Sequence, residues 1–230
     1  MTTGQSERVG RHYQGELGDD YYSWHRDVAQ MGAELNLWKF RDHVRPDDVV
    51  VDFGCSGGEL LAALPATRKI GVEVNAPALA VARERGIEAH ESTADIESAV
   101  ADVVISHHAL EHTLNPLAEL AGLRRVLKPG GRLVLWLPLD DWRSQRRATE
   151  DRNHHLWTWT PLNLRNLLSE AGFQVSECRV VTHGWPPGTR VLARRLPRRA
   201  FDALARVWGA LGRRRQLMAV ASTDGAQEGA

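Results

Sequence analysis

The chain has 230 residues, of which 43% are hydrophobic and 25% charged, and its 29 basic and 29 acidic side chains cancel at neutral pH. This mixture is typical of an ordinary globular domain and argues against a largely disordered chain or one with a general attraction for nucleic acid. No apolar run approaches the roughly 20 residues of a membrane-spanning helix, the two cysteines form no disulfide or metal-type spacing, and the polar start lacks the apolar core of a secretory signal, so we expect a cytoplasmic protein.

The first 48 residues contain a helical segment rich in aromatic residues, and we predict that they form an N-terminal helical cap or lid. Trp38 and Phe40 within it are expected to pack in the core. From residue 49 onward, apolar β-type runs alternate with helical patterns, which is typical of βαβ units and a parallel sheet. Strands are predicted at 49–53, 69–74, 87–90, 102–106, 132–137, 173–181 and 216–222, and helices at 59–64, 75–86, 115–127 and 160–171.

Arginine is concentrated late in the chain, between Arg190 and Arg215, where apolar residues recur at helical spacing. We predict a helical insertion over about 186–215 within a domain spanning 49–222, followed by a flexible tail at 223–230. Three interpretations of the insertion remain open. It packs on the domain with solvated arginines, binds an anionic acceptor, or contacts a membrane surface or lipid carrier.

A glycine-rich loop follows the first predicted strand and opens a helix, with the sequence DFGCSGGE at 52–59. Glycines at such a turn let the backbone approach a ligand and direct helix N–H groups toward it. Glu73 ends the second predicted strand, where a carboxylate can accept both hydroxyls of a ribose. The loop departs from the GxGxxG pattern of nicotinamide dinucleotides, and Asp52 would repel a pyrophosphate but suits a cofactor with an ammonium and a sulfonium. A tight turn without a ligand is the alternative.

Five consecutive motifs carry a resemblance to a known family: DFGCSGGELL, GVEVN, ADVVISHHALEH, LRRVLKPGGRLVLWLP and WTPLNLRNLLSEAGF. Over residues 49–181 the chain resembles the class I S-adenosylmethionine-dependent methyltransferases. Within them it is similar to the methyltransferase type 11/23 group, which includes ubiquinone-pathway O-methyltransferases and MetW-like proteins. The resemblance implies an α/β, Rossmann-like fold: a seven-stranded, mostly parallel sheet with helices on both faces and an antiparallel last strand.

The resemblance also implies S-adenosyl-L-methionine as cofactor and assigns residues to its parts. Glu73 would bind the ribose with Asn75 close by, and Ser106 and His107 would flank the methionine moiety and methyl group. The adenine would contact Thr93, Ala94 or Asp95. Ser56 stands where the family usually has glycine, and Gly57 can relieve the turn. The residues along the methionine part would be Asp52, Gly54, Cys55 and Gly58.

Several histidines are candidates for a catalytic base. His108, His154 and His155 would converge at the carboxyl ends of the strands, and imidazole suits proton removal from a hydroxyl acceptor. Hydrogen bonds that orient loops are the alternative role. The segment from His108 to His112 also spells HxxEH, a zinc-protease pattern, but that pattern needs a continuous helix, so we predict no metal. Asp140 and Asp141 could join His107 or His108 around a divalent ion, although no spacing enforces it.

The favoured function is methyl transfer from S-adenosylmethionine to a small-molecule acceptor, most simply a hydroxyl of a sugar, a polysaccharide precursor or a secondary metabolite. The acceptor could be anionic. The alternatives are the same chemistry on RNA or protein, and a nicotinamide-binding α/β module. No specific nucleic-acid partner is expected because no recognised reading module is attached, and the sequence leaves the oligomeric state open.

Overall fold

The structure is a computed structural model, which describes residues 10–139 and 153–224. Seven strands form one sheet in the order β3-β2-β1-β4-β5-β7-β6. All neighbouring strands are parallel except that β7 runs antiparallel to both β5 and β6, which confirms the predicted fold. The strands are β1 (Val49–Phe53), β2 (Arg68–Val72), β3 (Glu88–His90), β4 (Ala101–His107), β5 (Leu127–Leu139), β6 (Gln174–Thr182) and β7 (Arg215–Ser222).

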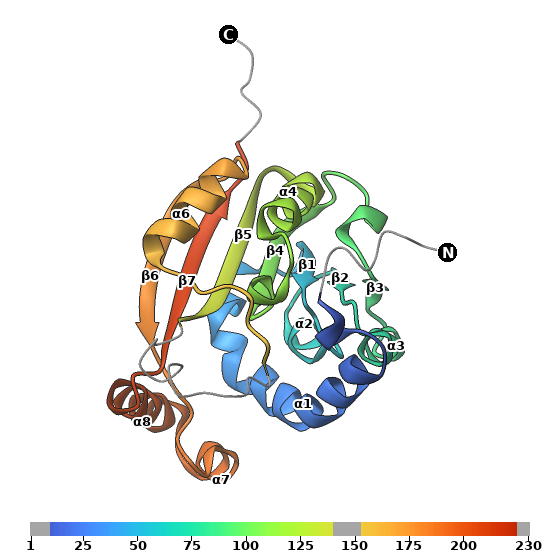
Figure 1. The fold of residues 1–230 in the computed structure, drawn as a ribbon. Helices are drawn as coiled ribbons and strands as arrows, with labels where there is room; N and C mark the ends of the chain where they lie inside the picture. The colour runs from blue at the N-terminus through green and yellow to red at the C-terminus, as the bar shows by residue number, and fades with distance from the viewer. Residues whose placement is uncertain (1–9, 140–152, 225–230) are drawn as a thin grey trace.

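Helices flank the sheet and cross one of its ends (Figure 1). Asn75 and Asn115 cap two of them as their sequence suggests: each side-chain oxygen accepts a backbone N–H at 3.0 and 3.1 Å, and a proline follows in the first turn. The helices are α1 (Gly15–Asn36), α2 (Glu59–Ala63), α3 (Ala76–Glu84), α4 (Pro116–Val126), α6 (Pro161–Glu170), α7 (Thr189–Arg195) and α8 (Arg198–Leu211), with short 3-10 turns η1 (Arg11–Tyr13), η2 (Leu37–Lys39), η3 (Arg41–His43), η4 (Thr93–Asp95) and η5 (Leu110–His112).

Both faces of the sheet are covered by hydrophobic side chains, as expected for parallel strands. Alternate strand residues face opposite ways. Val51 packs in the hydrophobic cluster that includes residues of α4 and α6. Val50 packs in the cluster on the other face, which includes residues of α2 and α3 together with Phe40. Phe40 is fully buried, as predicted, so the end of the N-terminal segment is anchored in the core of the domain.

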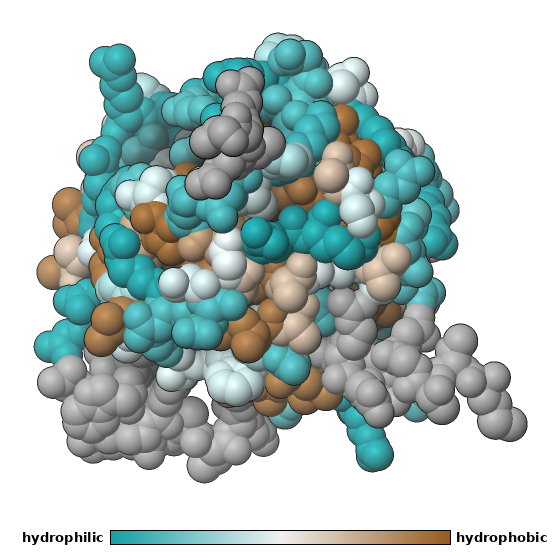
Figure 2. Space-filling view, turned by 90° about the horizontal axis from the view of Figure 1, so that it is seen from above, coloured by the Kyte–Doolittle hydropathy of each residue, from teal (hydrophilic) through white to brown (hydrophobic). Residues whose placement is uncertain are grey.

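Helix α1 lies across the carboxyl ends of the parallel strands, at the bottom of Figure 1. This is the end at which open α/β sheets bind ligands. Figure 2 looks onto the opposite end, where hydrophobic residues form small groups separated by hydrophilic ones. Within the described ranges, no helix has both the length and the apolar character needed to cross a membrane.

The structure departs most from the predicted elements in the Arg-rich segment and at the start of β5. The Arg-rich segment forms two helices rather than one, because Leu196, which precedes Pro197, is held in an extended conformation and ends α7. Its arginine-rich end also extends into the sheet, since β7 begins at Arg215. Strand β5 begins at Leu127 rather than at 132, because Leu127 already pairs with Ala101 of β4 before a shift in register.

Candidate functional site

A cavity of about 1130 Å³ opens at the carboxyl ends of the strands, and residues of α1 line part of it. The loops after β1, β2 and β4 form one part of its wall, and the ends of β5 and β6 with the start of β7 form another. Among the predicted site residues, the structure brings eight into this wall: Asp52, Gly54, Cys55, Glu73, Asn75, His107, His108 and His155.

The glycine loop connects β1 to α2 as predicted. Gly54 has a positive φ of 80°, and a Cβ there would lie 2.4 Å from the Cβ of Ala109 in the loop after β4. A side chain at this position would therefore both strain the turn and push against the neighbouring loop. Gly58 also has a positive φ and immediately precedes α2, but a Cβ there would meet Ile87, so Gly58 allows close packing behind the cavity wall.

The Glu73 carboxylate is fixed by two backbone donors. Oε2 accepts from the N–H of Ser56 and Oε1 from the N–H of Asn75, each at 2.9 Å. The glycine loop and the end of β2 are thereby held together around one acid group. The side-chain Nδ2 of Asn75 is buried and has no hydrogen-bond partner among the described residues, so it is a donor left for a ligand in the same wall.

Three acidic side chains, Asp52, Glu59 and Glu73, line this part of the cavity. Asp52 is 3% exposed, and burial, followed by the nearby charges of Glu73 and Glu59, raises its pKa to about 8. Burial also raises the pKa of Glu73, although its backbone hydrogen bonds oppose the shift. Buried carboxylates held so close together favour a cationic ligand, which would supply the missing opposite charge.

Four other predicted cofactor residues do not line the cavity. Ser106 is fully buried and its hydroxyl donates to the carbonyl of Phe53 at 2.9 Å, which joins the ends of β4 and β1. Thr93 is buried near Gly122 of α4, and Ala94 and Asp95 are exposed on η4. An adenine contact from these three positions remains a prediction.

The predicted catalytic histidines lie in different surroundings. His108 stacks on His107 at a ring distance of 4.2 Å, and burial lowers its pKa well below the usual value. His155 also lines the cavity. His154 is exposed, stacks on His12 at 4.9 Å and is not part of the cavity wall. Asp140 and Asp141 lie outside the described residues.

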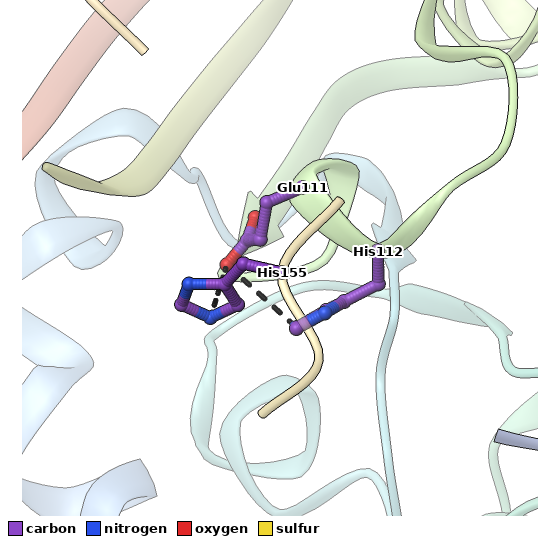
Figure 3. A group of neighbouring side chains, drawn as sticks. All are labelled: Glu111, His112 and His155. Atoms are coloured by element: carbon purple, nitrogen blue, oxygen red, sulfur yellow. Dashed lines mark ion pairs between the residues drawn. The ribbon is translucent and has the colours of Figure 1, made fainter. Parts of the chain in front are cut away.

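Glu111, His112 and His155 form a compact group whose ligand atoms all lie within 4.8 Å of one another (Figure 3). Oε1 of Glu111 lies 3.7 Å from Nε2 of His112 and 4.0 Å from Nε2 of His155. The hydroxyl of Tyr13 lies 2.7 Å from Nδ1 of His112 and also contacts the carbonyl oxygen of Asn153. The group suits ion pairing and could also hold a metal ion. The group differs from the zinc-protease HxxEH arrangement, which needs a continuous helix, because Glu111 and His112 lie on the short turn η5.

Several polar residues of the cavity wall were not predicted from the sequence, and these include Tyr13, Lys39, His183 and Gln216. A weak signal existed for Lys39, since it is one of three lysines in the chain and interrupts the apolar run LWKF. Nothing local indicates the others, because they enter the wall through contacts with distant segments.

Comparisons with known proteins agree with this geometry. A family model described as "Methyltransferase domain" matches residues 22–177. A probable S-adenosylmethionine-dependent methyltransferase from Mycolicibacterium smegmatis is 29% identical over 168 residues, covering 66% of this chain and 65% of that protein. A ubiquinone biosynthesis O-methyltransferase from Idiomarina loihiensis is 34% identical over 96 residues, covering 36% of this chain and 40% of that protein.

Solved structures share the fold. A SAM-dependent methyltransferase from Thermotoga maritima aligns with a TM-score of 0.65 at 18% sequence identity, covering 94% of this chain and 100% of that one. The chain spans between 32% and 65% of the length of the curated relatives it matches. Because the family model covers more than half of the chain, in agreement with the sheet order and the glycine loop, the chain belongs to the methyltransferase family.

Proposed function

We propose that this protein is an S-adenosylmethionine-dependent methyltransferase that acts on a hydroxyl group of a small molecule, such as a sugar, a polysaccharide precursor or a secondary metabolite. The observation that carries the proposal is the acidic end of the cavity. There, Glu73 is held by backbone N–H groups and lies near the buried Asp52 beside a glycine turn.

The donor set fits this cofactor chemically. An ammonium and a sulfonium would offset the clustered acid charge of Asp52 and Glu73, while the Glu73 oxygens can still accept from ribose hydroxyls. Asn75 Nδ2 is a further donor in the same wall. Gly54 turns the backbone with a positive φ in the same wall. A pyrophosphate cofactor would meet the same acid groups and be repelled, which argues against the nicotinamide alternative.

When bound, S-adenosylmethionine supplies a methyl group already activated for attack by an acceptor oxygen. The chain's task is then to orient the acceptor and to exclude water. Helix α1 covers the strand ends and suits that role. Among the three proposed bases, His108 is best placed to accept the hydroxyl proton: it lines the cavity, and its lowered pKa keeps the imidazole neutral at pH 7.

Isothermal titration calorimetry with S-adenosylhomocysteine tests the cofactor assignment. The wild-type protein should bind, and Glu73→Gln should bind at least about tenfold more weakly. The glutamine amide has only one oxygen, so it cannot accept from both backbone N–H groups. Glu88→Gln is the matched control: Glu88 is exposed on β3 and pairs with Arg68, so its affinity should be unchanged. Absence of binding by the wild type would overturn the proposal.

The acceptor class is tested by S-adenosylhomocysteine release in the presence of hydroxyl-bearing small molecules, and in parallel with RNA or protein. We expect turnover with a small molecule. Turnover confined to a polymer would instead favour the alternative acceptors.

A further inference from the structure

The charged groups of the cavity wall divide along the sheet. Its acidic residues, Asp52, Glu59 and Glu73, come from β1, α2 and the end of β2. On the other side of β4, near β5, β6 and β7, the described part of the wall contains basic groups and no carboxylate. These are Lys39, His183, Arg213, Arg214 and Arg215. One cavity therefore offers a cation site at one end and an electropositive site at the other.

Lys39 is the most deeply buried of these basic groups. It ends η2, is 2% exposed, and its Nζ lies 2.8 Å from Nε2 of His107 and donates to Oε1 of Gln216 at 2.5 Å. The amine also lies 4.7 Å from the centre of the Trp136 ring. None of these partners is an acid, and burial lowers the pKa of Lys39 well below its usual value. A buried amine in such surroundings lacks the opposite charge that would make its ammonium form favourable.

His183 supplies a second indication of a ligand. It follows β6, lines the cavity and is 5% exposed, and its Nε2 is buried without a hydrogen-bond partner among the described residues. Its backbone N–H donates to the carbonyl of Arg214 at 3.2 Å, which brings that arginine beside it. Burial, followed by the charge of Lys39, lowers the pKa of His183 to about 4, so the ring is a neutral donor or acceptor at pH 7.

We propose that this end of the cavity binds an acid group of the methyl acceptor, a carboxylate or a phosphate, against the amine of Lys39, with His183 and Arg214 beside it. The inference deepens the proposed function, because it gives the acceptor its chemical class. The bound oxyanion supplies the charge that Lys39 lacks, and Lys39 becomes protonated on binding. The acid group would anchor the acceptor while its hydroxyl extends toward β4, between the two ends.

The groups that face Lys39 from the surrounding elements set its protonation. His107 ends β4 and His108 follows it, His183 follows β6, and Gln216 lies on β7. Farther out on α8, Asp202 raises and Arg198 and Arg206 lower the pKa of His183. None of the described groups that face Lys39 is an acid, so burial opposes protonation of Lys39 in the free site and an added anion favours it.

The small number of lysines makes this directly measurable. With lysine labelled with 13C and 15N at the side-chain end, nuclear magnetic resonance should show three signals, from Lys39, Lys69 and Lys128. Lys128, which pairs with Asp102 at 2.7 Å, and Lys69 serve as internal references. In the free protein, Lys39 should titrate well below the ordinary pKa of a lysine side chain. Sodium phosphate or sodium benzoate, added at constant ionic strength, should move the Lys39 signal saturably to its protonated position.

The two probes distinguish the source of the charge: a response to phosphate indicates a phosphorylated acceptor, and a response to benzoate a carboxylic acid. No response of Lys39 to either anion would overturn the proposal, as would an ordinary lysine pKa for Lys39 in the free protein. This experiment uses the wild-type protein and needs neither cofactor nor turnover. Failure of S-adenosylhomocysteine binding would therefore count against the proposed function and not against the anion site.

A matched pair of variants gives an independent readout by calorimetry with the effective probe. Lys39→Met keeps the length of the side chain and removes the amine, and it should bind the anion about tenfold or more weakly while binding S-adenosylhomocysteine like the wild type. Lys69→Met, on β2 and outside the cavity, should change neither affinity. Equal anion affinity in the wild type and Lys39→Met would contradict the assignment.

Discussion

Asp52 shows how a single buried acid couples the stability of the protein to pH. Its ordinary pKa is 3.8, and in the folded protein burial and the neighbouring Glu73 and Glu59 raise it to about 8. Between these two values the unfolded chain is ionised whereas the folded one retains the proton. Folding therefore takes up a proton, and the contribution of Asp52 to the free energy of unfolding falls as the pH rises from about 4 to about 8.

Replacing this acid should therefore stabilise the free protein and weaken its function. We expect Asp52→Asn to raise the free energy of unfolding at pH 8 by roughly 1–3 kcal/mol, with a smaller gain at pH 5. Urea unfolding at the two pH values measures the difference. The same variant should bind S-adenosylmethionine more weakly, because the amide cannot offset a positive charge. An equal gain at both pH values would show that Asp52 is already ionised in the folded state.

Substitutions at two glycines distinguish the cost of backbone strain from the cost of a steric clash. Gly54 and Gly86 have φ values of 80° and 79°, but a Cβ at Gly54 would lie 2.4 Å from Ala109, whereas one at Gly86 would meet nothing within 4 Å. Gly86→Ala should lose about 1 kcal/mol of stability. Gly54→Ala should lose roughly 1–3 kcal/mol more and bind S-adenosylhomocysteine poorly. Chemical unfolding and calorimetry check both, and similar losses would rule out the predicted clash.

At the scale of elements, α8 of the Arg-rich segment packs against the residues after β6, which place His183 in the electropositive end of the cavity. Phe201 and Ala205 on one side of α8 are buried in a hydrophobic cluster with Leu35 of α1. At Gly209, the helix backbone passes close to the residues that follow β6. This packing supports the first interpretation of the insertion, while Leu211 at 77% exposure and Trp208 leave part of the helix facing outward. The helix thus fixes the position of His183 from outside the sheet.

Gly209→Ala tests that coupling. The added Cβ would lie 2.8 Å from the backbone nitrogen of Gly184 and 2.9 Å from the carbonyl carbon of His183, so α8 or the end of β6 must shift. We expect a loss of roughly 1–3 kcal/mol in the free energy of unfolding and weaker anion binding. Cofactor affinity should be unchanged, because β1 and β2 form that end. Ala203→Ser, exposed on the same helix, is the control. Equal losses of anion and cofactor affinity would contradict separate ends.

At the scale of the whole molecule, the cofactor should stabilise the sheet and the covering helix α1 together. Ligand binding to the folded state alone adds about 2.7 kcal/mol at a concentration one hundred times the Kd. We expect S-adenosylhomocysteine to raise the free energy of unfolding of the wild type by about that amount, and Glu73→Gln to gain less under the same conditions. Urea unfolding with and without ligand measures both. A variant that gained as much as the wild type would exclude Glu73 from the site.

The sequence by itself determined the features that lie within one segment. The glycine turn, the caps at Asn75 and Asn115, and the apolar strands are encoded by neighbouring residues, so their positions and the family fold could be predicted. The same local patterns predicted the acidic part of the site, since Asp52 and Glu73 end adjacent parallel strands. The adenine contact has no such local mark, and the predicted residues 93–95 lie outside the cavity wall.

Only the tertiary structure decided which side chains from distant segments contact one another in the cavity wall. Lys39 contacts Gln216, 177 positions away, and the hydroxyl of Tyr13 reaches His112 and Asn153. The structure also separated His154 from the cavity while keeping its neighbour His155 in the wall. Such contacts depend on strand order, helix placement and side-chain packing, which no single segment specifies. The sequence therefore determined the acidic end of the cavity, and long-range packing, including that of α8 against the end of β6, decided the electropositive end.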